Sequence, residues 1–258
     1  MTDALRFEWV RLRTLRSTYW LIGSALLVNA AIAFLAAYAT RHGTPAHDVV
    51  VAVVTGGGAH APVPMAIVLL AVLGVFASGH DYRYGTIQPT LTSVPQRVTL
   101  FTAKLIVVAG TAVLTAALSM VLNIAATLPF WDLPPDVTDP TVSGYLLLAA
   151  GWALLGVALG QLLRGVPGAL VVLLVTPMIV EQLVFRLSYV PQLDWLTPAV
   201  KFLPFTAGLQ LVSAAGEASG GLASEVGLLS RWPSGGVFAV FVALVVVTAG
   251  ALFRRRDA

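Results

Sequence analysis

Apolar residues gather into six long runs that are separated by short polar segments. The runs occupy residues 17–40, 61–79, 105–131, 141–163, 165–186 and 232–253. An α-helix rises about 1.5 Å per residue, so roughly 20 apolar residues cross the hydrocarbon core of a bilayer. Each run is therefore long enough to span a membrane as a helix. Glu181 is the only charged residue in the interior of a run.

The overall composition agrees with a chain that lies mostly in a membrane. Apolar residues make up 58% of the chain and charged residues 10%, and the mean hydropathy is +0.88. Soluble domains have about 25% charged residues. We therefore predict an all-α integral membrane protein, with residues 17–258 forming one six-span transmembrane domain. The chain has no cysteine, which excludes disulfide bonds and thiolate metal sites, and we expect no metal site.

The fifteen basic residues are divided unevenly between the two sides of the predicted spans. Four lie on one side: Arg41, Arg186, Lys201 and Arg231. The others lie on the opposite side: Arg6, Arg11, Arg13, Arg16, Arg83, Arg97, Lys104, Arg164, Arg254, Arg255 and Arg256. Basic residues are enriched in cytoplasmic loops, so we expect a plasma-membrane protein with both termini in the cytoplasm. Because these charges flank membrane segments, they suit membrane lipid, and we expect no nucleic-acid partner.

Residues 1–16 predict a helix that lies along the membrane surface. Leu5, Trp9 and Leu12 are spaced to share one helical face, with Trp9 as the membrane anchor. Arginines flank this face: Arg6, Arg11 and Arg13. The same arginines are equally well explained as an orientation signal without a further role.

The segment 80–104, between the second and third runs, has the most specific sequence. It begins His-Asp-Tyr-Arg-Tyr-Gly-Thr-Ile, continues through two prolines, and ends on the lysine that precedes the third run. A solvated loop with positive charge would explain the basic residues. It would not explain why an acid, an arginine, two tyrosines, a glycine and a threonine stand together.

This segment resembles the first cytoplasmic loop of ATP-binding-cassette (ABC) type-2 permeases. The pattern is acidic–x–Arg–x–Gly-Thr-Ile, then Leu-Thr-x-x-Pro-x-Arg, then a lysine that opens a span. The residues that carry it are Asp81, Arg83, Gly85, Thr86, Ile87, Leu91, Thr92, Pro95, Arg97 and Lys104. The family usually has glutamate where this chain has Asp81.

The resemblance implies a transmembrane subunit of an exporter that moves a hydrophobic or amphipathic substrate out of the cytoplasm. Such permeases form dimers, and each subunit binds a separate cytoplasmic ATPase. For this chain we expect a homodimer rather than a heterodimer. The first loop docks on that ATPase. The residues implied in ATPase coupling are Asp81, Tyr82, Arg83, Gly85, Thr86, Pro95, Arg97 and Lys104.

Nucleotide chemistry is expected in the partner and not in this chain. No GxxxxGK[ST] stretch occurs in the sequence, so the usual phosphate-binding loop is missing. The resemblance places ATP and Mg²⁺ in the partner ATPase, and this chain would bind no cofactor and perform no catalysis of its own.

The region 187–231, between the fifth and sixth runs, is too apolar for a plain linker. Pro191, Pro198 and Pro204 divide it into pieces. We expect short re-entrant or interfacial helices that cap the extracellular end, an element that type-2 permeases also have at this position. The glycine-rich portion 216–236 is expected to be a mobile tip.

Four polar residues in or near the spans are candidates for a substrate pathway or gate: Asn29, Asn123, Glu181 and Arg186. The two asparagines are mid-span amides, which more often join helices than contact substrates. Glu181 either faces a cavity or pairs with Arg186, or it snorkels to the nearby membrane surface. An ion-coupled secondary transporter that uses Glu181, or a membrane protein without transport activity, remain alternatives to the exporter subunit.

Overall fold

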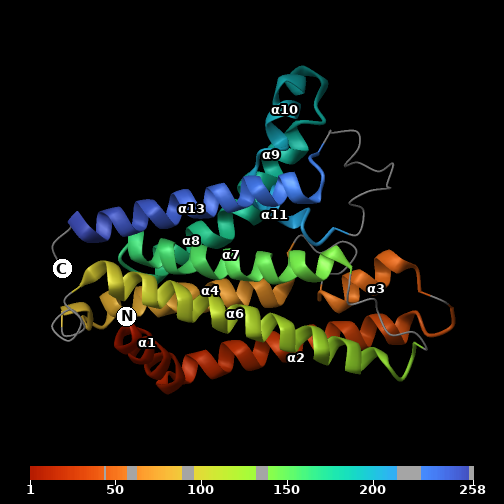
Figure 1. Ribbon diagram of the computed structural model, residues 1–258. Helices are drawn as coiled ribbons and strands as arrows, with labels where there is room; N and C mark the ends of the chain where they lie inside the picture. Colours follow the sequence, from red (N-terminus) through yellow and green to blue (C-terminus); the bar gives the residue numbers. More distant parts are fainter. Residues whose placement is uncertain (44, 57–62, 89–95, 132–138, 214–227, 256–258) are drawn as a thin grey trace.

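A computed structural model describes residues 1–43, 45–56, 63–88, 96–131, 139–213 and 228–255. These residues form helices and contain no strand, which confirms the predicted all-α membrane fold (Figure 1). In chain order the elements are α1 (Thr2–Thr14), α2 (Arg16–Ala39), α3 (His47–Val54), α4 (Met65–Arg83), α6 (Arg97–Thr127), α7 (Pro140–Leu162), α8 (Val166–Val175), a π-helical turn (Thr176–Val180), α9 (Glu181–Leu187), a 3₁₀ helix (Pro191–Leu196), α10 (Thr197–Val200), α11 (Pro204–Leu209) and α13 (Arg231–Arg255).

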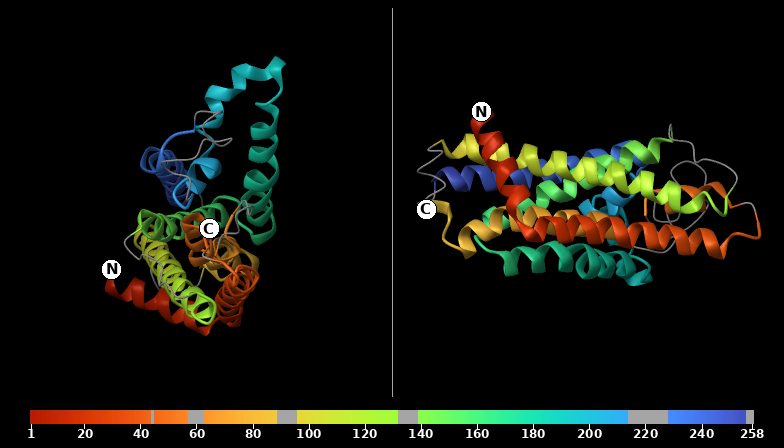
Figure 2. Two further views of the ribbon diagram at one scale, coloured as in Figure 1. Left: turned by 90° about the vertical axis from the view of Figure 1, so that its right-hand side faces the viewer. Right: turned by 90° about the horizontal axis from the view of Figure 1, so that it is seen from below.

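Six helical stretches are long and apolar enough to cross a membrane. They are α2, α4, α6, α7, the continuous stretch Val166–Leu187 and α13, so each predicted run contains one span. The start of α1 and the end of α13 lie at the same end of the bundle, which we call the termini end (Figures 1 and 2). The opposite end is called the distal end below.

Two helices extend beyond their apolar runs into the predicted loop 80–104. Helix α4 continues to Arg83, and α6 begins at Arg97, eight residues before the third run. Asp81 and Lys104 therefore lie on the spans themselves and not in the connecting loop. Residues 89–95, which include Pro95, are outside the described part of the chain.

Helices α4 and α7 form the centre of the bundle. Of their apolar windows, 61% and 56% are buried, against 22% for α2, for the fifth span and for α13. Glycines bring the two backbones together: a Cβ on Gly156 would lie 2.0 Å from the Ala71 carbonyl oxygen, and one on Gly74 would lie 2.2 Å from that of Ala153. Small residues at such crossings are how helices pack closely where the hydrophobic effect does not drive them together.

The fifth span is interrupted by a π-helical turn. Pro177 lies in this turn, and because proline has no backbone N–H it cannot maintain the regular α-helical ladder. Helix α9 follows directly, and α9 and α10 stand away from the other helices (Figures 1 and 2). The chain then returns to the bundle, where α11 packs against α13.

The short helices expected between the fifth and sixth spans are present. Pro191, Pro198 and Pro204 each occupy the first or second position of one of them, where a missing N–H is tolerated. One expectation was wrong: residues 231–236 are not a mobile tip, because they form the first turns of α13. Residues 216–227 of that predicted tip lie outside the described residues.

Candidate functional site

A cluster of four charged side chains lies at the termini end of the bundle, and three of the four are buried. Glu8 and Arg11 come from α1, Asp81 from α4 and Lys104 from α6. Glu8 is 2% exposed, Asp81 1% and Lys104 3%. Two acids face two bases, so the cluster carries no net formal charge. We refer to Glu8, Arg11, Asp81 and Lys104 as the charge cluster.

Asp81 is the centre of the charge cluster. Arg11 holds it with both terminal nitrogens, Nη2 at 2.5 Å from Oδ1 and Nη1 at 3.1 Å from Oδ2. Lys104 Nζ lies 2.5 Å from Oδ2. A two-pronged arginine–carboxylate contact fixes the relative orientation of the two groups as well as attracting them. The helices that carry these residues are therefore held in one register.

Further contacts complete the charge cluster. Arg11 and Lys104 both donate to the backbone carbonyl of Ala77, at 2.9 and 2.8 Å. Glu8 lies 3.4 Å from Arg11 and 3.7 Å from Lys104. Buried ions are tolerated when each is paired and hydrogen-bonded, and removing one partner leaves an uncompensated charge. The charge cluster is thus a strong link between α1, α4 and α6.

Helix α1 has a bundle-facing side that the sequence interpretation does not include. The residues on this side are Ala4, Glu8 and Leu12, whereas Trp9, the predicted membrane anchor, is 45% exposed. Arg6 and Arg13 are also exposed, as the membrane-surface interpretation requires. Arg11 is not a surface arginine, because it binds Asp81. The sequence interpretation missed Glu8, although an acid three residues before Arg11 is a recognisable helical pair.

The chain that follows α4 forms an exposed tip. Arg83, Tyr84, Gly85 and Thr86 are all exposed, and Gly85 has a φ of 65°, a left-handed conformation that glycine adopts without strain. The tip is tied to the charge cluster, because the Thr86 hydroxyl donates to Asp81 Oδ1 at 3.3 Å. We refer to residues 83–86 as the loop tip.

Two further contacts anchor the base of the loop tip and the start of α6. The hydroxyl of Tyr82 is hydrogen-bonded to Gln161 of α7. The guanidinium of Arg164 lies 5.9 Å from the centre of the Tyr82 ring. Arg97 donates to the Phe253 carbonyl of α13 at 3.3 Å. The residues expected to act in ATPase coupling therefore divide into an exposed group, Arg83, Gly85 and Thr86, and a buried group, Asp81 and Lys104.

A third buried acid, Glu181, caps α11 on the distal side. Its carboxylate accepts hydrogen bonds from the backbone N–H of Phe205 at 2.9 Å and of Thr206 at 2.6 Å, and from the Thr206 hydroxyl at 2.8 Å. These are the N–H groups at the start of a helix that lack partners within it. Glu181 is 3% exposed, which does not fit the snorkelling alternative. Arg186 is exposed and is not among the described partners of Glu181.

Helix α11 reaches well into the bundle. The ring of Phe205 lies 5.0 Å from that of Trp152, near the middle of α7, and 5.8 Å from that of Phe241 in α13. Beyond its other end, Arg231 donates to the Ser213 carbonyl at 2.9 Å and lies 3.7 Å from Asp139, the residue that caps α7. The α11 segment is therefore held from both sides.

Both mid-span asparagines join helices to one another. Asn29 of α2 donates to the Tyr145 hydroxyl of α7 at 3.3 Å, and that hydroxyl lies 3.2 Å from Ser119 of α6. Asn123 of α6 donates to the last carbonyls of α3, those of Val53 at 3.3 Å and Val54 at 2.9 Å. These contacts favour the interhelical role over a substrate contact.

Comparison with protein-family models and with characterised proteins finds no match. Among the described residues, no three His, Cys, Asp or Glu side chains come together as a set of metal ligands.

Replacing Asn123 by leucine is expected to loosen α3. The substitution removes two hydrogen bonds from the end of a short helix, which corresponds to about 1–2 kcal/mol. Amide hydrogen exchange of residues 47–55 should become about tenfold faster. Thr111→Val is the control, because Thr111 lies in α6 like Asn123 but its hydroxyl donates to the Val107 carbonyl one turn earlier in that same helix. Equal exchange in both variants would contradict the capping role of Asn123.

Proposed function

We propose that this chain is the transmembrane permease subunit of an ABC exporter of the type-2 class, driven by a separate cytoplasmic ATPase. The observation that carries the proposal is the loop tip, which is exposed and tied to the charge cluster. An exposed arginine and a glycine turn suit a reversible contact with a soluble partner, since rim charges set specificity and register. The buried charges behind them suit the transfer of movement.

The contacts provide a route from the loop tip to the spans. A partner that displaces the tip moves Thr86 and Asp81 with it. Arg11 and Lys104 follow, because separating a buried ion pair costs about 3–5 kcal/mol. Helices α1, α4 and α6 would therefore move together, and α7 would follow since it packs closely against α4. A docked ATPase would in this way change the whole bundle and not the loop alone.

The remaining parts of the proposal follow from charge and apolar surface. The excess of basic residues at the termini end supports a cytoplasmic position for that end, in a plasma-membrane protein. Most of the buried residues in the described part of the chain are hydrophobic, which supports a hydrophobic or amphipathic substrate over a hydrophilic one. A second copy of the chain would complete the exporter as a homodimer, with ATP and Mg²⁺ held by the ATPase.

An ion-coupled transporter would use Glu181, the one charged residue in the interior of an apolar run. Glu181 already receives three hydrogen bonds from α11. A carboxylate occupied in this way suits a structural role better than repeated binding and release of an ion. We therefore favour the ATP-driven mechanism.

The direct test is purification of the tagged chain from its native membrane in mild detergent, with and without nucleotide. Recovery of a stoichiometric soluble protein with a Walker A loop is the expected result. Recovery of the chain alone under every gentle condition, together with transport driven by an ion gradient, would contradict the proposal.

Reversing the charge of Arg83 tests the loop tip itself. Arg83→Glu replaces an attraction with a repulsion at the proposed contact, so we expect the ATPase to bind about tenfold more weakly, or about 1.4 kcal/mol. Arg255→Glu is the matched control, because Arg255 is an exposed arginine at the same end but outside the loop tip. Binding measured on the purified complex should be unchanged in the control. Equal weakening in both variants would remove the docking role of Arg83.

A further inference from the structure

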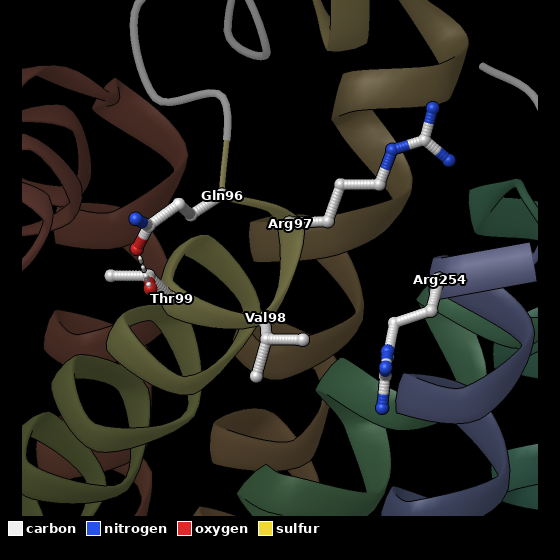
Figure 3. Close-up of a pocket in the computed structure, with 5 residues that line it drawn as sticks. All are labelled: Gln96, Arg97, Val98, Thr99 and Arg254. Carbon is white, nitrogen blue, oxygen red and sulfur yellow. Dashed lines mark hydrogen bonds between the residues drawn. The ribbon is translucent and has the colours of Figure 1, made fainter.

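A pocket lined by arginines lies at the termini end, away from the loop tip. It has a volume of about 390 Å³ and lies between the first turn of α6 and the last turn of α13. Figure 3 shows its lining residues: Gln96, Arg97, Val98, Thr99 and Arg254. Two of these described residues are basic and none is acidic, so the pocket favours an anion.

The lengths of the helices place this pocket at the depth of lipid headgroups. The 31 residues of α6 measure about 46 Å, which exceeds the roughly 30 Å of a hydrocarbon core. The uninterrupted apolar stretch of α6 starts after Lys104, so the residues from Arg97 to Lys104 extend past the core. Arg254 lies in the last turn of α13, beside the first turn of α6.

The lining groups have the chemistry of a phosphate site. Guanidinium groups present several donors in a plane, which matches a phosphate better than a point charge does. The Arg97 guanidinium also donates to the Phe253 carbonyl, so it is held beside the pocket. The first backbone N–H groups of α6 have no side-chain cap, which adds donors nearby. Val98 is 49% exposed and gives the pocket an apolar edge.

We propose that this pocket binds the headgroup phosphate of one anionic phospholipid. The lipid would bridge Arg97 of α6 and Arg254 of α13, and its chains would continue along the apolar surface of the two spans. It would also offset the repulsion between two neighbouring arginines. This inference does not depend on ATP-driven transport, because lipid retention is measured on the chain alone and the substituted residue, Arg254, is not among the residues expected in ATPase coupling.

Native mass spectrometry of the full chain in mild detergent tests the proposal. The probes are phosphatidylglycerol and phosphatidylcholine with the same acyl chains. We expect one phosphatidylglycerol to be retained in clear preference to phosphatidylcholine. Arg254→Gln should weaken phosphatidylglycerol binding about fivefold, the usual effect of one basic residue at a membrane surface. Arg255→Gln, the same change one residue on and outside the pocket lining, should leave the binding unchanged.

Three outcomes would overturn the proposal. Equal weakening in Arg254→Gln and Arg255→Gln would show a diffuse charge effect without a defined site. Equal retention of the two lipids would show that the headgroup charge is not recognised. Full displacement of phosphatidylglycerol by inorganic phosphate at comparable concentration would assign the pocket to a free anion. Size-exclusion chromatography of each variant shows that the fold is intact before lipid is added.

Discussion

Replacing Lys104 by methionine is expected to destabilise the protein by about 3–5 kcal/mol. The change preserves the length and apolar stem of the side chain but removes one of two positive charges from the charge cluster. Glu8 and Asp81 would then share Arg11 alone, and a buried site would carry a net negative charge. The free energy of unfolding in mixed detergent micelles measures this loss. Lys201→Met at the distal end, where Nζ lies 5.3 Å from the ring centre of Phe202, should cost about 1 kcal/mol or less.

A double substitution shows whether the charge cluster acts as a unit. Asp81→Asn alone should also be strongly destabilising, because it leaves two cations facing Glu8. Combining Asp81→Asn with Lys104→Met restores a net charge of zero, with Glu8 and Arg11 still paired at 3.4 Å. We expect the double variant to recover 1–3 kcal/mol relative to the sum of the single ones, approximately the coupling typical of contacting residues. Strict additivity would mean that the four charges are independent.

Whether a feature of this fold can be predicted from the sequence depends on the range of the interactions that produce it. The six spans could be predicted because apolar length is a local property of the chain. The start of α6 could not, because Lys104 stands just before the third apolar run in the sequence yet is buried in the protein. Its burial depends on partners from α1 and α4, up to 96 residues before it. No local pattern contains that information.

Helix α1 illustrates the same limit. Its sequence offers two overlapping faces, one with Leu5, Trp9 and Leu12 and one with Ala4, Glu8 and Leu12. Hydrophobicity alone indicates the first, as the face that meets the membrane. The second is the face that meets the bundle, where the acid at position 8 meets Lys104 and the neighbouring Arg11 binds Asp81. The charge of distant partners therefore decided which side of the helix is inside.

The sequence alone shows that Glu181 is a charged residue inside an apolar run, but it does not show which groups bind its carboxylate. They are mostly backbone N–H groups 24 and 25 residues later, which have no sequence signature. The hydroxyl of Thr206 is the only side chain among them. Arg186 was the nearest opposite charge along the chain, and the helix turned it to the outside instead.

Glu181→Ala is expected to release the start of α11 from the fifth span. The N–H groups of Phe205 and Thr206 would lose their acceptors in a buried setting, at a cost on the order of 3 kcal/mol. Amide hydrogen exchange in the peptide that contains these two residues should become about a hundredfold faster, the factor that corresponds to that energy. Glu181→Gln keeps one acceptor oxygen and should give an intermediate rate.

Arg186→Ala separates capping from ion pairing as the role of Glu181. If Glu181 depended on Arg186 for its charge balance, this variant would accelerate exchange in α11 as strongly as Glu181→Ala does. We expect no change, because Arg186 is exposed and the carboxylate is satisfied by α11. A transport assay of Glu181→Gln then distinguishes the ATP-driven mechanism from the proton-coupled one. An ATP-driven exporter should retain activity in Glu181→Gln as long as α11 stays in place, whereas a proton-coupled transporter would lose its pH dependence. Because Phe205 packs against Trp152 and Phe241, a freed α11 would expose an aromatic surface in the middle of the bundle. Glu181 therefore links the fifth span to α11 in the distal half of the bundle.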